Sequence, residues 1–187
     1  MGIEKQKDFC LSGKELFSYK GELLDLSVQE LWKWYFSDLI DIKSKVAEYL
    51  VTKALGFEEP YNTGYWSAHS IVYRGRRLEL RSASYMKSIH DEKPSMEYIR
   101  HIDIRVKDCD VYIFSLLPGK TKEEADPFNL DNWKFYAIPA WYIWSECGCN
   151  SSITMSKVQR LVKRSDYVDL KADIDKAIDS IDKSKKD

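Results

Sequence analysis

The stretch "VYRGRRLELRSASYMKS", residues 72–88, places a basic turn directly before a segment in which apolar and polar residues alternate. Together with "HSIVY" at residues 69–73, it predicts a β-hairpin that turns around Gly75. Successive side chains of a strand point to opposite sides, so Glu79 and Arg81 share one face. A carboxylate and a guanidinium so placed have two interpretations. They form either an exposed ion pair on a sheet surface or the remainder of a catalytic site that combined an acid with a cation.

The bulk composition is that of a folded protein with one core. The chain has 187 residues, of which 44% are apolar and 32% are charged. This length predicts a single domain over residues 1–187, with residues 1–25 as an N-terminal extension and a core at about 27–183. The net charge is −1, so nucleic-acid binding would require a local basic patch. No apolar run reaches the roughly 20 residues of a membrane-spanning helix.

The four cysteines do not follow the spacing of a typical zinc site. Cys10 and Cys109 are isolated, whereas Cys147 and Cys149 form a C-x-C pair that lies far from every histidine in the sequence. The role of this pair is left open. The cysteine usage favours a reducing, cytoplasmic location.

Helical patterns lie at both ends of the chain. Ser27 and Glu30 have the spacing of a capping box and predict a helix start. A mostly buried helix is expected at residues 46–55, with Gly56 as its C-terminal cap. A short helix is expected at residues 156–164. The final helix has apolar residues at helical spacing, namely Leu170, Ile174, Ile178 and Ile181.

Strand patterns fill the middle of the chain. Residues 95–106 alternate and predict a third strand, with one face formed by Met96, Tyr98, Ile102, Ile104 and Val106. "DVYIFSLL" at 110–117 has the character of a central strand that is buried on both sides. Another strand is expected from residue 133 until Pro139. Strands between terminal helices predict an α/β or α+β arrangement, with a mixed central β-sheet flanked by helices.

Three segments, taken in order, resemble a known family. They are "AEYLVTKALG" (47–56), the hairpin "YWSAHSIVYRGRRLELRSASY" (65–85), and "DVYIFSLL" followed by "DPFNLDNWKFYAIP" (110–139). Together they resemble uncharacterised bacterial proteins with the restriction-endonuclease-like, PD-(D/E)xK fold. The resemblance extends from about Leu31 to the final helix. Each motif is short, so the specificity lies in the order of the motifs.

This resemblance implies a metal-dependent DNA phosphodiesterase site. In active members an Asp, a Glu and a helix Glu hold Mg²⁺ or Mn²⁺, and a Lys two residues after the strand Glu helps to activate the attacking water. Here Glu48 matches the helix Glu and Glu79 matches the strand Glu, so these two are the implied metal ligands. The Asp position falls on Ser70 and the Lys position falls on Arg81.

These two replacements change the chemistry of the implied site. Ser in place of Asp removes a negative charge and a strong oxygen ligand, so the affinity for a cation should fall. Arg can bind a phosphate but cannot readily transfer a proton, because its pKa stays above about 12. The site is therefore better suited to binding a phosphate than to cutting one. An active nuclease with a substitute group remains the alternative, and the candidate substitutes are Lys45, His69, Lys87 and Asp103.

Two functions follow from the sequence. In the first, which is the leading interpretation, the chain acts on or binds double-stranded DNA, with phosphate contacts from the basic residues near the hairpin turn, namely Arg74, Arg76, Arg77 and Lys87. The alternative for this cluster is a solvated hairpin tip. In the second function, the chain is a non-catalytic protein–protein interaction module that retains the nuclease fold. The near-zero net charge and the aromatic stretch 133–144 favour the second function. The partner would be another protein or a second copy in a homodimer.

Overall fold

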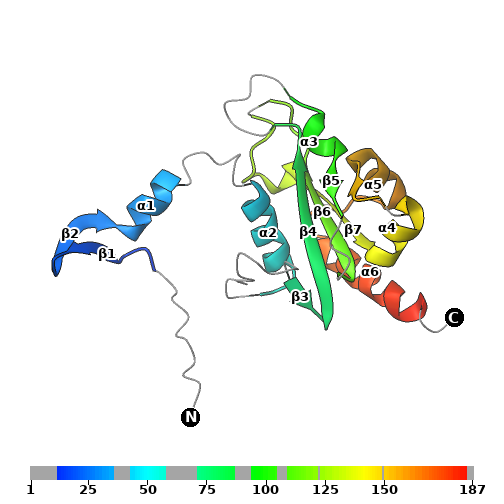
Figure 1. Cartoon of the computed structure of the whole chain (residues 1–187), viewed down its shortest axis with the longest axis horizontal. Coiled ribbons are helices and arrows are strands. Elements are labelled where there is room, and N and C mark those ends of the chain that lie inside the picture. Colours follow the sequence, from blue (N-terminus) through cyan, green and yellow to red (C-terminus); the bar gives the residue numbers. More distant parts are fainter. Residues whose placement is uncertain are drawn as a thin grey trace, which may run out of the picture. The chain divides into compact units, whose positions relative to one another are not determined.

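The chain divides into two compact units, residues 1–39 and residues 40–187. A computed structural model gives the structure (Figure 1). It describes residues 12–35, 43–57, 71–86, 94–104, 109–121, 123–148 and 150–184. The single domain over residues 1–187, with an extension at 1–25, stays a prediction.

The N-terminal unit is a hairpin followed by a helix. Strands β1 (Leu16–Tyr19) and β2 (Glu22–Ser27) pair antiparallel, and α1 (Val28–Tyr35) follows directly. The turn between the strands contains Lys20 and Gly21, both with positive φ. The sequence patterns did not predict this hairpin, which lies largely within the expected extension.

The capping box at the start of α1 is confirmed. The N–H of Glu30 donates to Oγ of Ser27 at 3.2 Å, and the N–H of Ser27 donates to Oε2 of Glu30 at 2.7 Å. Each side chain therefore satisfies a backbone donor that the first helical turn leaves open.

The larger unit contains a four-stranded mixed sheet in the order β3-β4-β6-β7. The pairs β3–β4 and β6–β7 are antiparallel, whereas β4 and β6 run parallel. The predicted mixed central sheet is thus confirmed. Its strands are β3 (Ile71–Tyr73), β4 (Arg76–Ser84), β6 (Val111–Leu117) and β7 (Lys134–Pro139).

The predicted hairpin is formed by β3 and β4. Arg74 and Gly75 make its turn, and both have positive φ, at 51° and 71°. Two consecutive residues with positive φ are typical of the tight turns whose twist matches paired strands. The turn therefore fixes the register in which Tyr73 faces Arg76.

Helices cover both faces of this sheet (Figure 1). The first face packs against α2 (Lys43–Ala54) and α6 (Leu170–Ser184). The second face packs against α3 (Glu97–Arg100), α4 (Ala140–Cys147), α5 (Met155–Leu161) and the strand pair β5 (Ile102–Asp103) and β8 (Ser152–Ile153). A short 3₁₀ turn, η1 (Leu130–Asn132), precedes β7.

Several sequence predictions are confirmed in this unit. All seven residues of β6 are buried, as expected for a central strand. The helix predicted at residues 46–55 is α2, and Gly56 caps it with φ 85° and an N–H that donates to the carbonyl of Lys53 at 3.0 Å. The four apolar residues predicted to line the final helix are all buried: Leu170, Ile174, Ile178 and Ile181.

One prediction is wrong, and one helix was not predicted. The prediction of a third strand at residues 95–106 is wrong. The segment forms the single helical turn α3 and then the two-residue strand β5, which pairs with β8 outside the main sheet. The buried isoleucines of this segment pack against the second face of the sheet. The residues after Pro139 form α4, a helix that the strand pattern did not predict.

Candidate functional site

The strand β4 carries Glu79 and Arg81 on the second face of the sheet. Their neighbours Leu78 and Leu80 lie on the first face, where they pack with α2 and α6. Glu79 is only 5% exposed. The exposed ion pair considered from the sequence is therefore excluded, and the pair belongs to the interior of the domain.

Arg81 is held by three acceptors. Its Nη1 donates to Oε1 of Glu79 and to the carbonyl of Leu80, the latter at 3.0 Å. Its Nε donates to the carbonyl oxygen of Asp103 on β5 at 2.7 Å. The guanidinium therefore connects β4 to the segment that covers the second face.

Two further polar side chains lie beside this pair. Tyr112, which faces Glu79 across the β4–β6 register, donates its hydroxyl to the carbonyl of Ile104 at 2.9 Å. Burial raises the pKa of Tyr112 well above its ordinary value. Burial also raises the pKa of the Cys109 thiol to about 11, and the nearby Glu79 carboxylate adds to that shift. Near neutral pH both groups stay protonated, so neither is an activated nucleophile.

Glu48 does not join this cluster. It lies on α2, which packs against the opposite face of the sheet from Glu79. Its Oε2 forms an ion pair with Nζ of Lys45, three positions earlier, at 2.9 Å. Within the described parts of the chain, no group of three or more His, Cys, Asp or Glu side chains is arranged to hold a metal ion.

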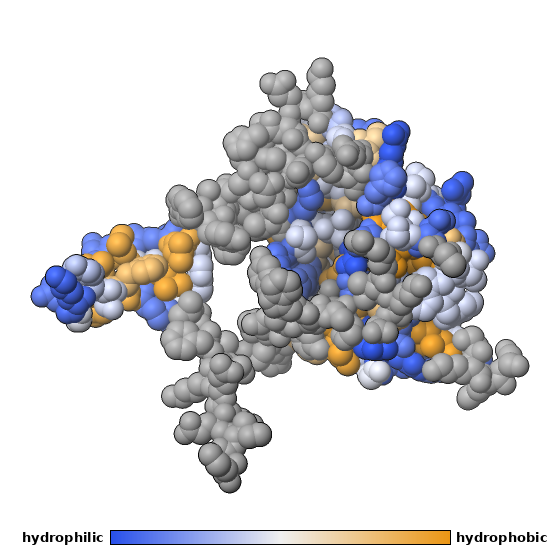
Figure 2. Space-filling view, in the orientation of Figure 1, coloured by the Kyte–Doolittle hydropathy of each residue, from blue (hydrophilic) through white to orange (hydrophobic). Residues whose placement is uncertain are grey.

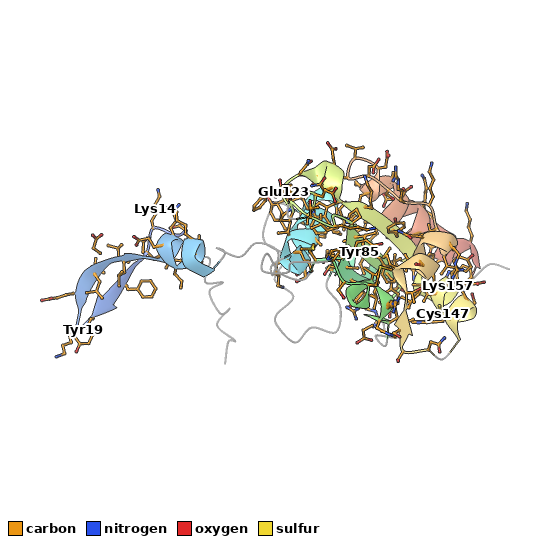
Figure 3. The ribbon with its side chains drawn as sticks, turned by 90° about the horizontal axis from the view of Figure 1, so that it is seen from above. Lys14, Tyr19, Tyr85, Glu123, Cys147 and Lys157 are labelled. Atoms are coloured by element: carbon orange, nitrogen blue, oxygen red, sulfur yellow. The ribbon has the colours of Figure 1, made fainter. Side chains whose placement is uncertain are left out.

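Other residues singled out from the sequence lie outside the described residues. These include Ser70, which stands at the implied Asp position, and the basic residue Lys87. His69 and Cys149 also lie outside them. Their proposed roles stay predictions. Cys147 is half-buried at the end of α4 and has a free thiol. Figure 3 labels it together with Lys157 of α5, whose Nζ lies 3.4 Å from Oε2 of Glu146.

The basic hairpin turn contacts an acidic stripe on α6. Nη1 of Arg74 lies 2.9 Å from Oδ1 of Asp175, and its Nη2 lies 2.8 Å from Oδ1 of Asp179. Arg76 forms an ion pair with Asp182 through Nη2. The three aspartates lie at positions i, i+4 and i+7 of the helix and so share one face. That spacing was readable in the sequence, but its pairing with the turn was not.

Asp110 completes the contacts of this turn. Its carboxylate lies 3.4 Å from Nη1 of Arg76 and accepts the backbone N–H of Arg77 at 2.8 Å. The three arginines that were expected to meet a phosphate backbone therefore all have carboxylates beside them within the chain.

The aromatic stretch 133–144 divides between the core and the surface. Trp133 is fully buried and stacks on Phe135, with ring centroids 6.2 Å apart. Trp141 is 45% exposed and contacts the ring of Tyr142 at a centroid distance of 5.6 Å. Among the aromatic side chains of residues 133–144, only that of Trp141 on α4 is exposed.

No protein-family model, curated protein or solved structure matches the chain. Among the helices that the structure describes, none has the length and apolar character needed to cross a bilayer. The function of this chain therefore has to be inferred from the geometry of its own residues.

Proposed function

We propose that this chain is a non-catalytic protein–protein interaction module with a restriction-endonuclease-like fold. The observation that carries the proposal is the ion pair between Glu79 and Arg81 on the second face of the sheet. The implied metal ligand Glu79 has a guanidinium of its own chain on one carboxylate oxygen. Arg81, at the position that holds the activating Lys in active relatives, cannot readily transfer a proton.

Metal binding would have to displace this guanidinium. A divalent cation prefers carboxylate oxygens, and a positive charge at the same oxygen opposes it. Moving Arg81 away would also break its hydrogen bonds to the carbonyls of Leu80 and Asp103. Glu48 offers no compensation, because α2 places it against the other face of the sheet.

The contacts of the basic turn also favour a protein partner over DNA. Arg74 and Arg76 have carboxylates of α6 beside them, and Arg77 lies near Asp110. A DNA phosphate would have to compete with these carboxylates. With a net charge of −1, the chain has no overall attraction for a polyanion that could offset this competition.

The N-terminal unit provides an apolar surface suited to protein contact. Tyr19 is 63% exposed and Leu23 is 70% exposed, and further large apolar side chains of this unit are also exposed: Leu16, Phe17, Leu24, Leu26 and Leu31. Figure 2 shows hydrophobic residues on the surface of this unit. Exposed apolar patches of this kind are typical of interaction sites.

The second candidate is a DNA-acting protein with an altered nuclease site. The order of the three motifs supports it, and the resemblance implies Mg²⁺ or Mn²⁺ as the cofactor. In that case Glu79 and Glu48 would bind the metal ion, and Arg81 would contact the scissile phosphate of double-stranded DNA. Both proposed functions are compatible with a cytoplasmic location and with a homodimer.

Calorimetric titration of Mn²⁺ distinguishes the two candidates. We expect no binding at millimolar Mn²⁺, either for the wild-type protein or for Glu79→Gln, which keeps the shape of the side chain and removes its charge. Binding to the wild-type protein that Glu79→Gln abolishes would overturn the interaction proposal in favour of a metal site. Circular dichroism of the variant controls for its folding.

DNA binding gives a second and independent test. We expect no affinity for a 30-base-pair duplex at about 50 mM salt. If binding occurs, its salt dependence identifies the contact, because affinity that depends on phosphates falls steeply as salt rises. A steep fall that disappears in an Arg74→Ala/Arg76→Ala variant would establish the basic turn as a DNA-binding surface.

Restoring the motif tests the proposed resemblance. The double variant Ser70→Asp/Arg81→Lys returns both altered positions to the residue types of active family members. If the fold is restriction-endonuclease-like, this variant should gain Mn²⁺ binding that the single variant Arg81→Lys lacks. A folded double variant without such a gain counts against the assignment of these positions.

A further inference from the structure

The strand β7 is the last strand of the central sheet, and its outer edge is only partly paired. Phe135 forms an isolated antiparallel bridge with Ser165. The N–H of Phe135 donates to the carbonyl of Ser165 at 3.0 Å, and the N–H of Ser165 donates back at 2.8 Å. Both backbone groups of Phe135 therefore point away from β6, toward the outside of the sheet.

The backbone groups of Ala137 point toward the same edge. Backbone direction alternates along a strand, so the N–H and carbonyl of Ala137, two residues after Phe135, also point outward. Within the described part of the chain, neither group takes part in a hydrogen bond. Ala137 is nevertheless only 5% exposed. Buried backbone donors and acceptors are nearly always satisfied, so this position is suited to an additional partner.

A groove of about 570 Å³ lies against this edge. Its size falls within the usual range for ligand sites. Small side chains leave room beside the strand, because Ala137, Ala172 and Ala177 all line the groove. Pro139 occupies the next outward position and has no N–H, so it limits pairing along this edge to a short segment.

The charges around the groove favour an acidic ligand. Lys163 and Arg164 line it and are exposed. Lys163 interacts electrostatically with Asp173 and Arg164 with Asp166, but neither cation is close enough to a described carboxylate to form an ion pair. Lys176 lies 2.7 Å from Asp173, whose other carboxylate oxygen accepts from Ser165 at 2.5 Å. The cations of the lining therefore exceed its carboxylates by one, since three cations stand against Asp169 and Asp173.

We propose that this groove binds an extended, acidic peptide segment of a partner protein by strand addition to β7. One residue of the segment pairs with both backbone groups of Ala137, as Ser165 pairs with Phe135. A carboxylate of the segment lies beside Lys163 and Arg164. This inference rests on the proposed function and assigns it a binding site.

A peptide fits these observations better than a free anion does. A phosphate or carboxylate ion could accept the N–H of Ala137 but would leave its carbonyl without a donor. An extended peptide satisfies both groups at once, which is the basis of recognition by strand addition. The exposed cations then supply a preference for acidic side chains.

Nuclear magnetic resonance of the full-length protein labelled with ¹⁵N tests the proposal. The probe is a mixture of acetylated and amidated pentapeptides with a central Glu and with Ala, Val, Thr or Leu at the flanking positions. We expect the Ala137 amide to shift in the presence of the mixture and its hydrogen exchange to slow at least tenfold. The matched control mixture has Lys in place of the central Glu and should bind at least tenfold more weakly.

Two changes separate the backbone contribution from the charge contribution. Methylation of the backbone nitrogen of the central Glu should weaken binding about tenfold, because it removes the donor to the Ala137 carbonyl. The surface variant Lys163→Glu/Arg164→Glu should abolish the preference for Glu over Lys. Lys171→Glu, a change on the same helix as Ala172 but outside the lining of the groove, should leave the preference unchanged.

Three results would overturn the proposal. The first is an Ala137 amide that does not shift at millimolar peptide, and the second is an Ala137 amide that is already protected in the free protein. The third is binding that survives backbone methylation. If the peptides fail while the protein also binds neither Mn²⁺ nor DNA, only the groove proposal is lost. If Mn²⁺ binds at Glu79, the proposed function is lost, whatever the peptides do.

Discussion

The two faces of the central sheet differ in kind, although the same strands form both. The first face, under α2 and α6, is packed with side chains such as Leu78 and Ile113. The second face, under α3, α4 and α5, also contains the ion pair of Glu79 and Arg81. Alternate residues of β4 therefore differ in role. Those that face α2 and α6 are apolar and packed, whereas Glu79 and Arg81 on the opposite face are charged.

This difference indicates that the ion pair is not there for stability. Taking two charges out of water costs free energy that their attraction often fails to recover, so an apolar pair of similar volume is frequently as stable or more so. The first face shows that this sheet readily forms a fully apolar layer. We therefore expect Glu79 and Arg81 to add little net stability compared with an apolar pair.

Removing one charge of the pair should have the largest effect. Glu79→Ala leaves the Arg81 guanidinium largely buried without its carboxylate, and we expect the free energy of unfolding to fall by roughly 3 kcal/mol. Chemical denaturation monitored by circular dichroism measures this change. The double variant Glu79→Leu/Arg81→Met should recover most of the loss. A double variant as unstable as Glu79→Ala would show that the pair does stabilise the fold.

A cavity on the first face should cost a comparable amount. Ile113→Ala removes buried methyl and methylene groups from the central strand, and we expect a loss of about 2–4 kcal/mol. Ile113→Val, which removes one methylene, should cost about 1 kcal/mol. Tyr112→Phe, the matched change on the second face, removes the hydroxyl that donates to the carbonyl of Ile104 and interacts with the Cys109 thiol, and it should also cost about 1 kcal/mol. If Tyr112→Phe costs as much as Ile113→Ala, the polar contacts of the second face contribute as much to the free energy of unfolding as the apolar packing of the first face, contrary to this expectation.

Alkaline pH should also lower the stability, and the Cys109 thiol on the second face should contribute part of this loss. The Cys109 thiol has a folded-state pKa of about 11 against an ordinary value of 9.0. The unfolded chain therefore loses this proton at lower pH than the folded chain does, and stability falls as the pH rises from about 9 to 11. Urea unfolding at several pH values measures the slope. Cys109→Ala should make it shallower, whereas Cys147→Ala should leave it unchanged. An equal slope in all three proteins would contradict the assignment.

Local patterns predicted the elements whose signals are complete within a few residues. The capping box of Ser27 and Glu30, the cap at Gly56 and the turn at Gly75 each depend on short-range geometry, and each is present in the structure. The apolar stripe of α6 was predicted for the same reason, because helical spacing is visible along one segment.

Predictions failed where distant segments decide the structure. The alternation at residues 95–106 resembles a strand, but the main sheet is complete without it. The segment instead forms α3 and β5, which bury Ile99 and Ile102 against the second face. The hairpin of β1 and β2 was missed because its strands have no buried face, so their residues carry no inside–outside signal.

The candidate site was predicted only in its local part. That Glu79 and Arg81 share a strand face follows from their spacing of two residues. That Glu79 is buried and Arg81 partly buried, and that Arg81 donates to the carbonyl of Asp103, depends on β5 covering the second face. The separation of Glu48 from Glu79 likewise depends on which face receives α2.

The sequence by itself determined the α/β class, the mixed sheet, the main helices and the pairing of an acid with a guanidinium on one strand. Periodicity and turn chemistry act over a few residues, so these features are encoded locally. Only the tertiary structure decided that the arginine turn meets the aspartates of α6, that Glu48 and Glu79 occupy different faces, and that Ala137 borders a groove. These features join residues far apart in the chain, and they depend on packing rather than on local conformational preference.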